Sequence, residues 1–233
     1  WTLIFVSLSL GALGLLDDIL KIKLKNSSGL KSKYKFTGQL IISSLVLFIL
    51  AKYSNHEYLY DLYFPFFKNL IFHMGIFFIP FGLFVIIGAS NAVNLTDGLD
   101  GLATVPVMLV ALSFTLISYV VGNTIFSEYL QIQYIPDVGE LSIFCGSIVG
   151  ACLGFLWYNA PPAKIFMGDT GSLSLGGSLA AIAIIVKHEI VLAIVGGLFV
   201  LETVSVIIQV ISYKLTGKRI FKMAPIHHHF EKK

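Results

Sequence analysis

Runs of apolar residues, each close to the length that crosses a lipid bilayer, restrict the folds open to this chain. A membrane-spanning helix needs about 20 predominantly apolar residues. Seven runs approach or reach that length, at about 1–16, 37–53, 71–90, 102–121, 141–158, 172–187 and 190–213. Of the 233 residues, 56% are hydrophobic and only 12% are charged, which is too apolar for a soluble domain. The sequence therefore predicts an all-α, polytopic helical integral membrane protein of about seven spans, forming a single domain over residues 1–233.

The linkers between the runs differ in charge. If every run crosses the membrane, linkers 17–36, 91–101 and 159–171 and the tail from residue 214 lie on one side. This side carries most of the 16 Lys and Arg residues, so the positive-inside rule predicts that it faces the cytoplasm. The aromatic-rich linker 54–70 is expected on the opposite side, as an interfacial belt or a small hairpin. No signal peptide is visible, because no basic leader precedes the first run.

The most polar stretch lies between the third and fourth runs, from residue 91 to residue 101. It carries two amides, Asn91 and Asn94, and two carboxylates, Asp97 and Asp100. A membrane-crossing chain does not leave such groups in hydrocarbon, so they belong at a membrane surface or in a wet cavity. They could bind hydroxyls, bases or metal-bound water. The alternative is an ordinary polar turn between two spans.

A pair of adjacent acids follows the first run. On a helix, Asp17 and Lys21 share a face, and Asp18 lies beside them. Adjacent carboxylates suit a divalent metal or the acceptance of a proton, whereas the alternative is a solvated helix end with one ion pair. The lysines that follow act as a topology signal, and Lys25 and Lys33 are candidates to attract a phosphate group as well.

A second acidic linker joins the fifth and sixth runs. Asn159 begins it, and Asp169 lies between two glycines near its end. Thr170 and Ser172 are expected to cap the next helix, whose N-terminus attracts anions. Asp169 would repel a bare phosphate there, so a phosphate bridged by Mg²⁺ fits better. The alternative is a capped turn without chemistry.

Three consecutive histidines, His227, His228 and His229, stand near the end of the chain. Adjacent histidines rarely converge on one zinc ion, and a purification tag would be longer. A loop that binds phosphate or sugar is the remaining interpretation.

The later runs also contain polar residues, which are either structural hydrogen-bonders or functional groups, and small residues, which predict packing. Glu202 and Gln209 lie two turns apart on one face, and intramembrane polar groups usually face the bundle interior. Cys145 and Cys152 are about 10 Å apart on one helix, too far for a disulfide. The glycines at every fourth position of the fifth run, 146, 150 and 154, predict close helix packing.

Four motifs, in this order, resemble those of the polyprenyl-phosphate hexose-1-phosphate transferases. They are Asp17-Asp18-x-x-Lys21, Asn91-x-x-Asn94-Leu-Thr-Asp97-Gly-x-Asp100-Gly101, Phe166-Met-Gly-Asp169-Thr-Gly-Ser172 and Pro225-Ile-His-His-His-Phe-Glu231. Lys21 and the tail point, within that family, to the members that transfer phospho-N-acetylmuramoyl-pentapeptide. Members have ten spans with both ends outside, so the resemblance implies that this chain lacks the first two and the last.

The resemblance implies an enzyme of the bacterial inner membrane whose active site faces the cytoplasm. Its expected reaction is Mg²⁺-dependent and uses UDP-N-acetylmuramoyl-pentapeptide and undecaprenyl phosphate, giving UMP and lipid I for peptidoglycan synthesis. Membrane lipid is an expected partner, nucleic acid is not, and a homodimer is left open.

The resemblance also suggests roles for single residues. Asp169 is the expected Mg²⁺ ligand, bridging the diphosphate of the nucleotide. Asp17 is expected to deprotonate or position the lipid phosphate, and Asp18 to support the metal or Lys21. The expected substrate-binding residues are Lys25, Lys33, Asn91, Asn94, Asp97, Asp100, Asn159, Phe166, Gln209, His227, His228 and His229. Among these, Asn94, Asp97 and Asp100 would contact uridine and ribose, Phe166 would stack on uracil, and Asn159, Gln209 and the histidines would hold the sugar and diphosphate.

Two alternative functions remain open at this stage. One is the sister class that moves N-acetylglucosamine-1-phosphate to the same lipid, although the tail motif argues against it. The other is an ion-coupled transporter, although transporter sites usually lie near the bilayer midplane, whereas the acids here gather on one side.

Overall fold

A computed structural model describes residues 1–25, 29–53, 56–67 and 70–233 of the chain. Its elements are α1 (Thr2–Leu24), α2 (Ser32–Tyr53), α3 (His56–Leu59), β1 (Asp61–Tyr63), β2 (Ile71–His73), η1 (Gly75–Phe77), α4 (Phe78–Thr96), α5 (Thr104–Val121), α6 (Thr124–Leu130), η2 (Val138–Glu140), α7 (Leu141–Asn159), α8 (Gly168–Ile185), α9 (Glu189–Val195), α10 (Gly197–Thr216) and α11 (Ile226–Glu231). Within these residues seven helices are long and apolar enough to cross a membrane. The predicted all-α, multi-pass membrane architecture is confirmed.

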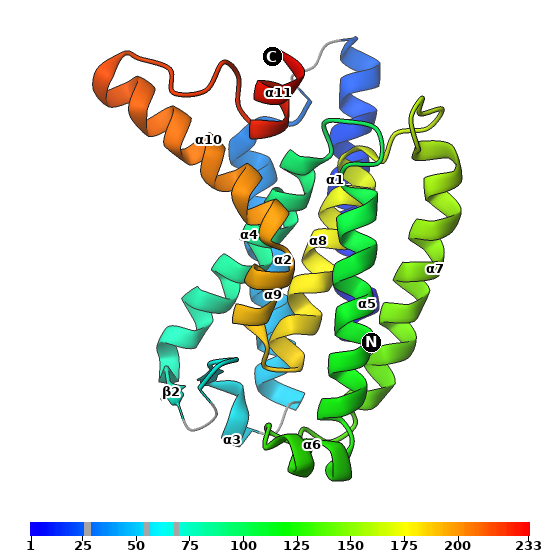
Figure 1. The fold of residues 1–233 in the computed structure, drawn as a ribbon, viewed down its shortest axis with the longest axis vertical. Helices are drawn as coiled ribbons and strands as arrows, with labels where there is room; N and C mark the ends of the chain where they lie inside the picture. Colours follow the sequence, from blue (N-terminus) through cyan, green and yellow to red (C-terminus); the bar gives the residue numbers. More distant parts are fainter. Residues whose placement is uncertain (26–28, 54–55, 68–69) are drawn as a thin grey trace.

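Consecutive long helices run up and down the molecule, so the linkers alternate between its two ends (Figure 1). One end carries α3, the hairpin and α6, and the other carries α11. The hairpin pairs β1 and β2 antiparallel, with Asp61 opposite His73, which confirms the small hairpin predicted in this linker. The polar linkers singled out in the sequence share the end that holds α11.

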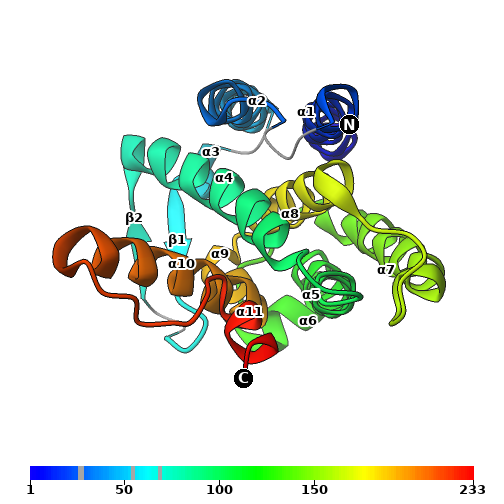
Figure 2. The ribbon, with the colours of Figure 1, turned by 90° about the horizontal axis from the view of Figure 1, so that it is seen from above.

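Helix α8 lies between α1, α4 and α5 in the view from above (Figure 2). It is the most buried of the seven long helices. Glycines let its neighbours approach closely: a Cβ added to Gly176 would stand 2.5 Å from the carbonyl oxygen of Ala89 on α4. A Cβ added to Gly177 would overlap the side chain of Leu10 on α1. Helices α4 and α8 are therefore packed close to backbone contact, and α1 fills the space beside Gly177 with the Leu10 side chain.

Several predicted span boundaries are wrong, because helices continue into the polar linkers. Helix α1 runs to Leu24 instead of ending near residue 16, and α4 includes Asn91 and Asn94. Helix α8 begins at Gly168, four residues early. Polar side chains in these extensions find partners on neighbouring helices, so they need no loop. The predicted seventh span is interrupted at Gly196, which separates α9 from α10.

The prediction of close packing at the α7 glycines is also wrong for the described residues. No described atom lies within 4 Å of a Cβ built on Gly146, Gly150 or Gly154. Cys145 and Cys152, on the same helix, are buried free thiols, as predicted. The cysteine face of α7 is therefore the one that packs on the bundle.

Candidate active site

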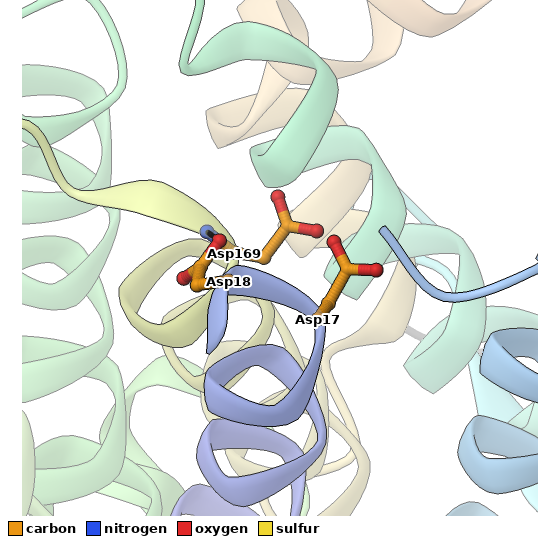
Figure 3. A group of neighbouring side chains, drawn as sticks. All are labelled: Asp17, Asp18 and Asp169. Carbon is orange, nitrogen blue, oxygen red and sulfur yellow. Dashed lines mark hydrogen bonds between the residues drawn. The ribbon is translucent and has the colours of Figure 1, made fainter. Parts of the chain in front are cut away.

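Three carboxylates from two helices meet at the end of the bundle that carries α11. Asp17 and Asp18 lie on α1, and Asp169 is the second residue of α8 (Figure 3). One oxygen from each lies within 4.8 Å of the others. The meeting depends on Gly14, because a Cβ there would stand 2.7 Å from the Cα of Thr170 and would overlap the carbonyl group of Asp169. A glycine one turn before the acids thus lets α1 touch the start of α8.

Asp18 closes the N-terminus of α8. Its carboxylate accepts hydrogen bonds from the backbone N–H of Asp169 at 3.4 Å and of Thr170 at 3.0 Å, and from the Thr170 hydroxyl at 2.8 Å. These bonds satisfy N–H groups that the first turn of a helix leaves unpaired. The predicted capping by Thr170 and Ser172 is wrong, because the helix already begins at Gly168 and the Ser172 hydroxyl donates to the Gly168 carbonyl.

Two ammonium groups and one amide hold the remaining carboxylates. Lys21 Nζ lies 2.6 Å from Asp17 Oδ2 and 3.0 Å from Asp169 Oδ2. Lys35 Nζ lies 2.6 Å from the same Asp169 oxygen, and Asn94 Nδ2 donates to the other at 2.7 Å. The sequence reasoning missed Lys35. Helix α2 begins at Ser32, so Lys35 lies on it one turn before the buried Gln39. A predicted helix start at Ser32 would have placed these two polar residues on one face and so drawn attention to Lys35.

The donor set fits a divalent cation. Hard cations such as Mg²⁺ take carboxylate oxygens, usually from one or two protein residues together with phosphate oxygens. Asp17 is buried, and Asp18 and Asp169 are mostly buried, so their charges require compensation. The two lysines supply only part of it, because three carboxylates face two ammonium groups.

A cavity of about 850 Å³ opens beside this cluster, between α1, α2 and α4. Its polar end is formed by Asp17, Lys21, Lys35, Asn91, Asn94 and Asp169. Its wall further along α2 and α4 is apolar, with Leu40, Leu83, Phe84 and Ile87. The Asn91 amide donates to Gln39 Oε1 at 3.0 Å and thereby joins these two helices. The cavity can therefore hold an anionic group and an attached hydrocarbon chain together.

The linkers after α4 and α7 form a second polar region. Asp100 Oδ2 accepts a hydrogen bond from the Ala163 N–H at 2.8 Å, which joins the two linkers. Asn159 is buried, accepts from Thr104 Oγ1 at 2.6 Å and donates to the Ile165 carbonyl at 3.0 Å. Phe166, in contrast, is 71% exposed, so its ring is available to stack on a base.

Asp97 stands between the acid cluster and this region. Burial raises its pKa to about 6, and the nearby Asp169 and Asp18 carboxylates add to the rise, while a hydrogen bond from the Gly168 backbone opposes it. The Asp97 carboxyl group therefore gains or loses its proton near neutral pH. In that pH range it can act toward a ligand either as a hydrogen-bond donor or as an acceptor.

The C-terminal segment folds back over α10. Gln209 Oε1 accepts from the N–H groups of Ile220 and Phe221, and its Nε2 donates to the Phe221 carbonyl. His229 Nδ1 accepts from the Lys222 N–H at 3.0 Å. Both side chains hold this segment in place: a structural role was one of the two interpretations of Gln209, whereas this role of His229 was not predicted.

The predicted site residues thus fall into three groups. The first is the acid cluster and its cavity, with Asp17, Asp18, Lys21, Asn91, Asn94 and Asp169. The second is the region of the two linkers and the tail, with Asp97, Asp100, Asn159, Phe166, Gln209, His227, His228 and His229. The third is Lys25 and Lys33, whose side chains are exposed and do not line the cavity. The substrate-binding roles of all three groups stay predictions.

Comparison with known proteins bears on the same residues. The model of a family described as glycosyl transferase family 4 matches residues 1–187, which include the acid cluster. Proteins named phospho-N-acetylmuramoyl-pentapeptide-transferase align with the whole chain, at 68% identity in Pelagibacter ubique (strain HTCC1062) and 58% in Rickettsia prowazekii (strain Madrid E). The chain spans 64% of the length of each of these relatives. The motif resemblance is confirmed, and the chain belongs to glycosyl transferase family 4.

Proposed function

We propose that the full-length protein transfers phospho-N-acetylmuramoyl-pentapeptide from its UDP conjugate to undecaprenyl phosphate. The products are UMP and lipid I. The relatives aligned with the whole chain carry the name of this transferase, which supports the choice of sugar. Mg²⁺ is the proposed cofactor, and the cytoplasmic face of a bacterial inner membrane is the proposed location.

One observation carries the proposal: a carboxylate cluster opens into a cavity whose far wall is apolar. Asp17, Lys21 and Asp169 line the polar end, at one end of the transmembrane bundle. A phosphate on a polyprenyl chain requires this combination, because its head is anionic and its tail is hydrocarbon. A transporter using intramembrane acids would be expected to hold them near the bilayer midplane instead.

Within this reaction the residues of the cluster would position charged groups. Bound beside Asp169, Mg²⁺ would neutralise charge on the nucleotide diphosphate. The ammonium group of Lys21 contacts both Asp17 and Asp169. It could therefore shift toward either carboxylate when a phosphate binds. A phosphate monoester is already largely ionised at neutral pH, its second pKa being about 6. Asp17 would therefore contribute more by holding Lys21, whose ammonium group can place the attacking phosphate, than by removing a proton.

The nucleotide would lie over the two linkers. Asp97 and Asp100 stand at the turn after α4, and the exposed ring of Phe166 lies on the linker that Asp100 contacts through Ala163. Carboxylates accept hydrogen bonds from ribose hydroxyls and from the uracil N–H, while an aromatic ring stacks on the base. Asn159 would support this site indirectly, because its hydrogen bonds to Thr104 and to the Ile165 carbonyl fix the conformation of the second linker.

The test is UMP release by the full-length protein in detergent, with UDP-N-acetylmuramoyl-pentapeptide, undecaprenyl phosphate and Mg²⁺. Release that requires both substrates, stops with a chelator and yields lipid I would support reaction, substrates and metal together. Release only with UDP-N-acetylglucosamine would move the protein to the sister class. No release with either nucleotide sugar, from folded protein, would refute the proposal and favour a transporter.

A further inference from the structure

A short backbone segment before α2 contacts the acid cluster and has no part in the chemistry proposed above. It consists of Gly29 and Leu30, and both residues lie against the side chain of Asp17. Asp17 is only 3% exposed, although it borders the cavity between α1, α2 and α4. A buried carboxylate is costly unless it is paired, so its contacts with this segment bear on how Asp17 works.

Both oxygens of the Asp17 carboxylate have a partner. The Leu30 backbone N–H donates to Asp17 Oδ1 at 2.6 Å, and Lys21 Nζ lies 2.6 Å from Asp17 Oδ2. Hydrogen bonds to a charged group are short and strong, and bonds at both oxygens leave the carboxylate one orientation. The position of the Lys21 ammonium group therefore depends, through Asp17, on the position of the Leu30 N–H.

Gly29 permits the close approach of this backbone to the two side chains. Its φ is +48°, a conformation that glycine adopts without the steric cost a side chain would add. A Cβ at position 29 would stand 2.5 Å from Asp17 Oδ1 and 3.0 Å from Lys21 Cε. An alanine would therefore push the carboxylate away from the Leu30 N–H and disturb Lys21 as well. The glycine is required by the acid cluster as well as by the turn.

Leu30 also connects the cluster to the cavity. It lines the cavity together with Lys21, Lys35 and the apolar residues of α2 and α4. One residue thus holds Asp17 through its N–H and forms part of the wall that a bound lipid would contact. The segment is placed where the anionic head and the hydrocarbon chain of such a lipid would meet.

We propose that the Gly29–Leu30 backbone is a positioning element for the phosphate of the lipid substrate. The Leu30 N–H holds Asp17, Asp17 holds Lys21, and the Lys21 ammonium group receives the phosphate at the polar end of the cavity. The inference rests on the function proposed above and adds to it the residues that set the position of Lys21. Neither Gly29 nor Leu30 touches the reacting atoms, so both act through Asp17.

The experiment compares Gly29→Ala with Gly75→Ala in the full-length protein. Gly75 is the matched control, because its φ is +53° and no described atom lies within 4 Å of a Cβ built on it. Both substitutions place a side chain in the same backbone conformation, but only the first one meets Asp17. In Gly29→Ala, Asp17 Oδ1 must retreat from 2.5 Å to the 3.4 Å at which ordinary contacts begin.

The first readout is the steady-state kinetics of UMP release. We expect Gly29→Ala to raise KM for undecaprenyl phosphate about 10- to 100-fold, as is typical when a residue that orients a binding group is lost. KM for UDP-N-acetylmuramoyl-pentapeptide should stay near the wild-type value, and Gly75→Ala should change neither. A purely structural glycine would lower the amount of folded enzyme, and hence the rate, without a selective change in one KM.

The second readout is a double-mutant cycle in Tm with Asp17→Ala, which removes the carboxylate that the new Cβ would meet. Gly29→Ala should lower Tm more in the wild type than in the Asp17→Ala background, because residues in contact are energetically coupled. This comparison requires no activity. If Gly29→Ala alone failed to fold, the inference would require the double variant to fold, and its failure would count against the inference.

Equal losses of Tm in the two backgrounds, or equal rises of both KM values, would overturn the inference. A selective rise in KM for undecaprenyl phosphate, together with coupling between positions 29 and 17, would establish it. If the wild type released no UMP, the proposed function would fail, whereas the Tm cycle would still decide whether Gly29 holds Asp17 in place.

Discussion

Replacing Gly14 by alanine is expected to separate the three carboxylates of the acid cluster from one another. Gly14 precedes Asp17 by one turn, and α1 touches the start of α8 there. An added Cβ would stand 2.7 Å from the Cα of Thr170, whereas ordinary contacts begin at 3.4 Å. The atoms in conflict are backbone, so no side chain can rotate away and the two helices must move apart.

The size of the effect follows from what this contact holds together. Asp18 reaches Thr170 through bonds of 3.0 and 2.8 Å, and a shift that restores normal contact at Gly14 would stretch both. Misplacing catalytic groups by about 1 Å can cost about 100-fold in rate. Forcing an extra methyl group into tight packing costs about 1–3 kcal/mol of stability. We therefore expect kcat/KM for UMP release to fall about 100-fold, with a lower Tm.

Gly11→Ala is the matched control for this experiment. It lies on the same helix and faces the same neighbour, but its Cβ would meet Ser174 at 3.6 Å and the Thr170 carbonyl oxygen at 3.7 Å, which are ordinary contacts. Both substitutions gain the same helix propensity, so the difference between them isolates the clash. Gly11→Ala should keep wild-type activity and an equal or higher Tm.

Equal activity and equal Tm in the two variants would refute the reasoning. The close approach of α1 to α8 would then not set the geometry of the acid cluster. A fall in Tm without a fall in kcat/KM would show that the contact stabilises the bundle but leaves the site intact.

Three further outcomes are expected in the full-length protein. Asp169→Asn should abolish UMP release and weaken Mn²⁺ binding measured by electron paramagnetic resonance, because one of three clustered charges is lost; near-normal turnover would contradict this. The pKa of Asp97 is raised to about 6, so its carboxylate is lost as the pH falls through that value, and nucleotide binding should weaken there. Titration calorimetry should show this acid limb in the wild type but not in Asp97→Asn. Gly98→Ala should lower kcat/KM as much as His227→Ala, because a Cβ at position 98 would displace the His227 imidazole. A smaller effect of Gly98→Ala would show that the position of the His227 ring does not depend on Gly98.

The architecture was largely predictable because bilayer thickness fixes the length of a span. The number of long helices and the ends on which the polar linkers lie followed from apolar length and lysine position alone. The boundaries did not, because Lys21 and Asn94, in the helical extensions of α1 and α4, have a partner on another helix, Asp169 of α8. A single sequence does not display such tertiary compensation.

The sequence predicted which residues belong to the site better than it predicted which of them contact one another. Asp17 and Asp169 were expected to act on the two different substrates, with Asp18 in support, and the structure brings the three carboxylates together. Lys35 was missed because the second helix was expected to begin later, which left that lysine in a linker. Gly14 carried no local signal at all, since a glycine within an apolar run reveals nothing of the backbone it will meet.

The excess negative charge of the acid cluster has a thermodynamic consequence for ligand binding. Asp17, Asp18 and Asp169 exceed Lys21 and Lys35 by one charge, and a divalent cation would reverse that sign. A phosphate carrying about −1.5 to −2 charges would then bring the total to about −0.5 to −1, whereas without the cation the same phosphate would leave about −2.5 to −3. Cation and phosphate must therefore bind cooperatively, each raising the affinity for the other by the same factor. The cluster would thus favour the fully loaded site over either half-loaded one, and the metal would be held firmly only while there is phosphate to transfer.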